Sequence, residues 1–144
     1  MSDEPEAFLI SLSERLWPIA NERFSDLSAS ERVFILAWEV EAEVNNGGFN
    51  QFFFNSAGDR ASATAAALRA IGAERMASIV DRANSLFPEG PPADRSVRQN
   101  FLEGIDPDTE LFEELDKEFY SYPDDLSALL YRFVTEHRSD IRST

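Results

Sequence analysis

The stretch Ser28–Asn46, SASERVFILAWEVEAEVNN, decides the fold because both of its ends and both of its faces carry recognisable signals. Ser28 and Glu31 have the spacing of a capping box, which marks the start of a helix. Asn46-Gly47-Gly48 favours a residue in the left-handed conformation, which would end the helix there. Apolar residues cover two sides of the helix, so we expect it to be central in the fold. One stripe holds Val33, Leu36, Ala37, Val40 and Val44, and a second group holds Phe34, Ile35 and Trp38.

Helical periodicity continues through the rest of the chain and strand alternation is almost absent, so the sequence predicts an all-α fold. Asp106 is expected to cap one helix, and Pro123 to be the first residue of another. Proline-rich residues 88–94 predict a surface loop. The length of 144 residues predicts one compact domain, residues 1–144, with about six to nine helices around the central apolar helix. The further helices are expected over residues 8–19, with a kink or break at Pro18, and over residues 61–71, 73–87, 107–120 and 123–137.

The composition excludes several classes of function. The 27 acidic residues outnumber the 13 basic ones, for a formal charge of −14. Such a surface repels DNA, RNA and anionic lipid, so a macromolecular partner is expected to be basic. The chain has no cysteine and only one histidine, His137. We therefore expect no metal site, no cofactor and no nucleophilic triad, and so no enzyme.

The beginning of the sequence also predicts a location. Residues 1–6 are acidic where a signal peptide is basic and then apolar. No apolar run approaches the roughly 18 residues that are needed to span a bilayer. These patterns predict a cytoplasmic protein.

The segment Asn45–Asp59, NNGGFNQFFFNSAGD, mixes amides, glycines and phenylalanines in an unusual way. One interpretation places the amides around an aromatic-floored ligand pocket, with Glu39 and Glu43 available as an acid and base pair. The other is structural: glycines allow a sharp reversal, polar side chains cap helix ends, and phenylalanines anchor a short helix. We favour the structural interpretation, and expect an ion pair for the two glutamates. The structural interpretation assigns mainly structural roles to Asn45, Asn46, Gly47, Gly48, Phe49, Gln51, Phe52, Phe53, Asn55, Gly58 and Asp59.

The second notable segment is acidic. Residues 101–125 hold ten acids against Lys117 alone. On a helix over 107–120, several of these acids fan out opposite the apolar stripe, where like charges repel by a few tenths of a kcal/mol per pair. That cost indicates either a solvated face or a surface for a cationic partner. The candidate partner-binding acids are Glu103, Asp106, Asp108, Glu110, Glu113, Glu114, Asp116, Glu118, Asp124 and Asp125.

The motif NNGGFNQFFFNSAGD, with AIGA at 70–73 and LFPEGPPAD at 86–94, resembles a small acidic bacterial domain family typified by the neisserial DNA-mimic protein. The resemblance covers roughly residues 28 to 135. It implies an all-helical fold, a homodimer and no catalytic residues. For the type member it implies an acidic surface that occupies the DNA-binding site of a transcriptional regulator.

These observations together predict an acidic binding protein, a DNA mimic that competes with DNA for the basic face of a transcriptional regulator or nucleoid protein. A typical DNA-binding protein makes about 6 to 10 contacts with phosphates, and ten acids are on the same scale. Two alternatives remain open. One is a small-ligand-binding protein or enzyme that uses the Asn45–Asp59 segment, and the other is an immunity-type protein that neutralises a basic toxin.

Overall fold

The long helix α2 (Ala29–Phe54) forms the centre of the computed structural model, which describes residues 3–142. It packs against α1, α3, α5, α6 and α7. The described residues form only helices, turns and loops, which confirms the all-α prediction, while residues 1–2 and 143–144 of the expected domain lie outside them. The other helices are α1 (Asp3–Arg23), α3 (Ala61–Ala70), α4 (Glu74–Asn84), α5 (Arg95–Ile105), α6 (Glu113–Tyr120) and α7 (Leu126–Glu136), with 3-10 turns η1 (Phe24–Asp26), η2 (Ser56–Arg60) and η3 (Arg138–Asp140).

The predicted capping box at the start of α2 is present. Ser28 Oγ accepts the Glu31 amide at 3.1 Å, and Glu31 Oε1 accepts the Ser28 amide at 2.9 Å. The Glu31 carboxylate is buried, and Arg142, beyond α7, also donates to it from its backbone and side chain. The end of the described chain is thereby tied to the start of the central helix.

The predicted stop at Asn46-Gly47-Gly48 is a kink instead. Gly48 has φ 76° and ψ −178°, as expected for a left-handed glycine, but the helix resumes at Phe49 and runs to Phe54. It resumes because Phe49 and its neighbours at i+3 and i+4, Phe52 and Phe53, bury their rings in the core, as the sequence predicted. α2 therefore consists of a longer first part and a short second part on either side of the two glycines.

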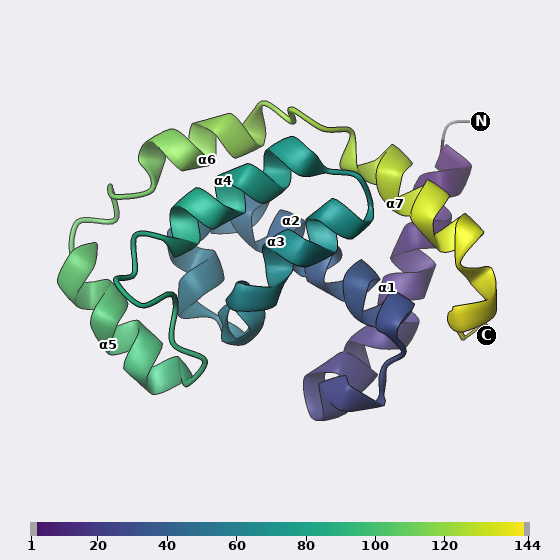
Figure 1. Cartoon of the computed structure of the whole chain (residues 1–144), viewed down its shortest axis with the longest axis horizontal. Helices are drawn as coiled ribbons and strands as arrows, with labels where there is room; N and C mark the ends of the chain where they lie inside the picture. Colours follow the sequence, from purple (N-terminus) through teal and green to yellow (C-terminus); the bar gives the residue numbers. More distant parts are fainter. Residues whose placement is uncertain (1–2, 143–144) are drawn as a thin grey trace.

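One cluster of buried side chains connects all seven α-helices of residues 3–142. Its aromatic part gathers around the second part of α2, where Phe53 lies 4.8 Å from Phe87 and 5.3 Å from Phe112 between ring centroids. Phe49 meets Phe119 of α6 edge-on at 5.7 Å. Figure 1 shows α5 and α6 at one end of the molecule and α1 and α7 at the other, with α3 and α4 lying across α2.

The structure corrects two predicted helix starts. α6 begins at Glu113 rather than Pro107, because the Asp106 carboxylate accepts the Leu111 amide at 2.8 Å and closes a turn instead of capping a helix. Thr109, at φ 57°, also interrupts helical geometry there. α7 begins after Asp125, whose side chain accepts the Ala128 amide, so Pro123 precedes the helix.

The structure also differs from the sequence prediction at two other helices. α1 continues through Pro18 without a break. α5 (Arg95–Ile105) was not predicted, whereas the loop before it was. None of the helices within residues 3–142 is long and apolar enough to cross a membrane.

Replacing Gly48 with valine should lower the free energy of unfolding by more than about 1 kcal/mol, because valine strongly disfavours positive φ. A Cβ at this position would also lie 2.5 Å from Asp116 Oδ2. Gly104→Ala is the matched control, since a Cβ there meets nothing within 4 Å and alanine favours the helix by up to about 1 kcal/mol. Urea unfolding measures both, and equal stability of the two variants would contradict the kink geometry.

Candidate functional site

Two acids of the acidic segment, residues 101–125, hold the kink of α2 in place. The helix that restarts at Phe49 has free backbone N–H groups at its first turn. Asp116 of α6 accepts the Phe49 amide at 2.8 Å, and so caps this restart from another helix. Asp106, only 4% exposed, accepts the Asn50 side-chain amide at 2.7 Å. The predicted helix face of solvated carboxylates is therefore wrong at Asp116, which points into the fold.

The electrostatic setting of Asp116 reflects this position. Burial raises the pKa of Asp116 above its usual range, and the neighbouring charges of Asp106 and Glu113 raise it further, while the hydrogen bond from Phe49 acts in the opposite direction. The acidic segment thus carries an electrostatic cost at its contact with α2. The hydrogen bonds to Phe49 and Asn50 offset part of that cost.

Three more of the ten acids have partners within the chain. Asp124 accepts the Met76 amide at 2.8 Å in the first turn of α4, and Asp125 caps α7. Glu118 forms a two-pronged ion pair with Arg82 of α4, with both N–O distances at 2.7 Å. These acids connect α6 and the loop after it to α4 and α7.

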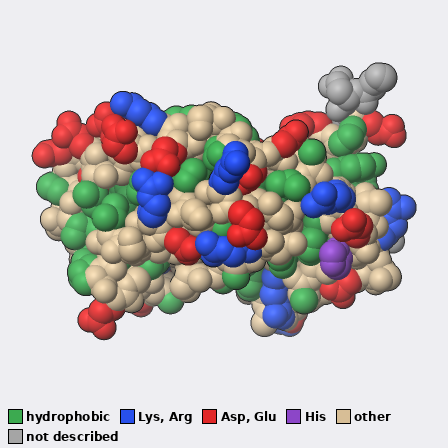
Figure 2. Space-filling model, turned by 45° about the horizontal axis from the view of Figure 1, so that its top comes forward, with side chains coloured by type: hydrophobic (Ala, Val, Ile, Leu, Met, Phe, Trp, Pro, Cys, Tyr) green, Lys and Arg blue, Asp and Glu red, His purple; other side chains and the backbone are tan. Residues whose placement is uncertain are grey.

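The remaining five acids are exposed, and we call them the exposed acidic segment: Glu103, Asp108, Glu110, Glu113 and Glu114. Within residues 3–142, the only ion pair found for any of them is a 3.9 Å contact between Lys117 Nζ and Glu114. Figure 2 shows carboxylates gathered at the upper left of the molecule. Partner binding by the ten acids stays a prediction, but the structure leaves chiefly these five free for it.

The amides of the Asn45–Asp59 segment are used within the fold. Asn45 donates to the Tyr122 hydroxyl at 2.6 Å, while Gln51 and Asn55 both donate to Glu43 Oε1, at 3.2 and 2.8 Å. A ligand would have to displace these contacts. The arrangement matches the structural interpretation of the motif, and Asn46 is exposed at the kink.

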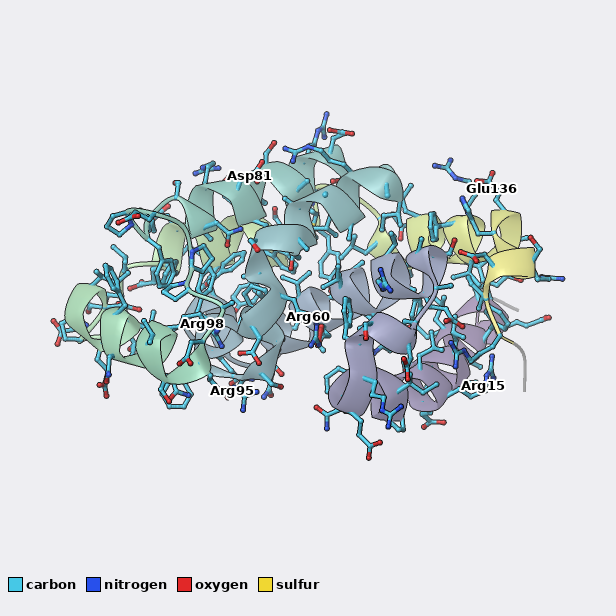
Figure 3. The ribbon with its side chains drawn as sticks, turned by 60° about the horizontal axis from the view of Figure 1, so that its bottom comes forward. Arg15, Arg60, Asp81, Arg95, Arg98 and Glu136 are labelled. Atoms are coloured by element: carbon cyan, nitrogen blue, oxygen red, sulfur yellow. The ribbon has the colours of Figure 1, made fainter. Side chains whose placement is uncertain are left out.

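Arg98 of α5 is the central residue of the site that the sequence reasoning missed. Its side chain is fully buried and donates to the carbonyls of Phe53 at 2.5 Å and Asn55 at 2.9 Å, and to Asp59 at 2.8 Å. Gly58 is required beside it, because a Cβ there would lie 2.8 Å from Arg98 Nε. Arg98 shares a helix stripe with Leu102, four residues on, which was the available signal. Figure 3 shows Arg98 next to Arg95, which also binds Asp59.

Glu39 and Glu43, the candidate acid and base pair, have separate structural partners. Arg60 donates to both oxygens of Glu39, at 2.8 and 2.5 Å, in the expected ion pair. The expected ion pair of Glu43 is not found among the described residues, because its carboxylate accepts from the side-chain amides of Gln51 and Asn55 instead. Burial raises the pKa of Glu39 to about 7, although Arg60 opposes that shift. His137 packs on the Phe133 ring at 4.0 Å, and no group of three metal-ligating side chains occurs in residues 3–142.

These features define an acidic, all-helical domain whose motif residues are largely occupied in holding the fold. A family model described as DMP19-like protein matches residues 25–137. The chain therefore belongs to the DMP19-like protein family, which confirms the resemblance drawn from the NNGGF motif. The comparison with curated proteins found no match, and neither did the comparison with solved structures.

The raised pKa of Glu39 predicts a pH dependence of stability. The folded chain holds this proton more tightly than the unfolded chain, whose pKa is near 4.5. The resulting stabilisation is fully present below pH 4.5 and is lost as the pH rises through about 7. The wild type should therefore lose roughly 2 to 3 kcal/mol relative to Glu39→Gln across this window. Urea unfolding at a series of pH values measures the difference.

Glu136→Gln, at an exposed position, is the control for this series. It should shift the stability of the protein by a similar small amount at every pH. A difference between wild type and Glu39→Gln that stays constant from acid to neutral pH would contradict the burial of a titrating carboxyl at this position.

Proposed function

We propose that this protein acts by binding, as a DNA mimic that competes with DNA for the basic DNA-binding face of a transcriptional regulator or nucleoid protein. The observation that carries the proposal is the exposed acidic segment, five carboxylates between residues 103 and 114 with one weak contact to Lys117. Membership of the DMP19-like family supports the same direction.

The number of free carboxylates suits this role. A protein that binds DNA neutralises on the order of 6 to 10 phosphates. The five acids of the exposed acidic segment come close to the lower end of that range. The net charge of −14 adds long-range attraction toward a basic surface and speeds encounter.

The fixed position of the segment also favours binding. Asp106, within the segment, and Asp116, just after it, attach the segment to the kink of α2, and Glu118 attaches α6 to α4. Carboxylates that are held before the partner arrives lose less conformational freedom on binding. A homodimer, as the resemblance implies, would present two such segments, and sedimentation of the purified protein measures that state.

The test is a charge reversal that spares the structural acids. Glu110→Lys, Glu113→Lys and Glu114→Lys together should abolish capture of basic DNA-binding proteins from a lysate of the source organism at low salt. The matched control reverses three exposed glutamates elsewhere, Glu22, Glu89 and Glu136, and changes the net charge equally. Circular dichroism checks that the helices persist in both triple variants.

Binding experiments with the captured protein, once it is purified, distinguish DNA mimicry from the immunity-type alternative. Competition predicts that duplex DNA displaces the wild type from it, and that affinity falls steeply as salt rises through about 0.15 M. Simultaneous binding of DNA and this protein would contradict mimicry. A captured basic protein with toxin activity and no DNA-binding site would favour the immunity-type alternative.

A further inference from the structure

Two hollows lie on either side of Trp38, where α1 and α2 pack together. One, of about 350 Å³, is lined by Trp17 and Glu14 of α1, and the other, of about 250 Å³, by Ile10 and Glu6 of α1 with Glu41 of α2. Trp38 lines both, so the two hollows adjoin each other at this side chain. We call this surface the tryptophan groove: Glu6, Ile10, Glu14, Trp17, Trp38 and Glu41.

The floor of the groove is apolar and exposed. Ile10 is 44% exposed and Trp17 is 39% exposed. The indole of Trp38 stacks on buried Phe34, with ring centroids 5.5 Å apart, and is therefore held rigidly in place. Both tryptophans of the chain thus lie at this one surface. Trp38 is half-buried and Trp17 is exposed, and tryptophan side chains at the surface are typical anchor points of protein interfaces.

The charges around this floor have one sign. Glu6, Glu14 and Glu41 line the two hollows, and no basic side chain does so among the described residues. The Glu41 carboxylate accepts a hydrogen bond from the Tyr122 hydroxyl at 2.7 Å. Burial raises the pKa of Glu41, and the charges of Glu6 and Asp125 raise it further. A cation placed in the groove would relieve this repulsion.

These features select among possible occupants. A second copy of the chain that met this surface across a two-fold axis would place the same acids against each other. Anionic lipid is repelled for the same reason. Along α1, Glu6 and Trp17 are separated by about 16 Å, the length of three helical turns. Helix pairs with an apolar groove of this kind accept an amphipathic helix.

We propose that the tryptophan groove docks a three-turn amphipathic helix of a partner protein, with large apolar side chains flanked by lysine or arginine. The groove is separate from the exposed acidic segment, because α1 lies at the opposite end of the molecule from α5 and α6 (Figure 1). α1 also precedes the residues that the family model matches, 25–137. The α1 side of the groove therefore lies outside the family match, whereas Trp38 and Glu41 lie within it.

The two tryptophans provide a direct readout. The probe is a helical peptide of about 12 residues, made of leucine and lysine with the leucines on one face. Binding of the peptide should cause a saturable blue shift of tryptophan emission, because the peptide excludes water from the indoles. Trp17→Ala, at an exposed position, should weaken binding about tenfold or more, with Trp38 still reporting. A peptide with glutamate in place of lysine should not bind.

A matched pair on α1 separates groove binding from general charge attraction. Glu14 and Glu22 are both exposed on this helix, but only Glu14 lines the groove. Glu14→Lys should weaken peptide binding about tenfold, and Glu22→Lys much less. Equal effects of the two substitutions, or an equal loss when Glu110, Glu113 and Glu114 are reversed, would overturn the proposal.

Two further outcomes would assign the groove to another occupant. The first is a dimer of this chain, seen by sedimentation, that dissociates in the Trp17→Ala variant. The second is a blue shift with anionic phospholipid vesicles that equals the shift with the peptide. Either result would overturn the proposed helical partner.

Discussion

The hydrogen bond from the Phe49 amide to Asp116 is the interaction on which the rest of the structure depends. It caps the second part of α2, which carries the phenylalanines at the centre of the aromatic core. It also fixes α6, and with it the exposed acids of the 103–114 segment, against the central helix. The glycines make this contact possible, since Gly48 leaves room for the carboxylate where a side chain would not. The Asn45–Asp59 motif and the acidic segment are therefore held together by this contact.

The fold could be predicted where local signals and tertiary packing agree. The capping box at Ser28 and the apolar stripe of α7 each specify a helix without outside help. α5 could not be found in this way, because Val97 and Phe101 are exposed while a charged residue, Arg98, is buried in their place. The start of α6 was misplaced because Asp106-Pro107 has the composition of a helix start, yet its carboxylate closes a turn and binds Asn50.

For the candidate site, the sequence predicts how many acids the segment holds, but not which of them are free to bind a partner. The sequence indicates an acidic segment and a structural motif, but the carboxylates that serve the fold are selected by contacts between distant residues. Asp116 and Phe49 are 67 positions apart, and Asp124 reaches α4 across 48. No periodicity within residues 101–125 distinguishes these acids from Glu113 or Glu114. The three-dimensional arrangement separates them, and so identifies which acids are free to meet a basic partner.

The account depends on Asp116 capping the second part of α2, and amide hydrogen exchange at Phe49 measures this directly. In the wild type, the Phe49 amide should be strongly protected. In Asp116→Ala, its exchange should accelerate toward the unprotected rate, while the amides of Ile35 and Val40 in the first part of α2 stay protected. Unchanged protection of Phe49 in the variant would contradict the capping role, and with it the proposed link between the glycine motif and the acidic segment.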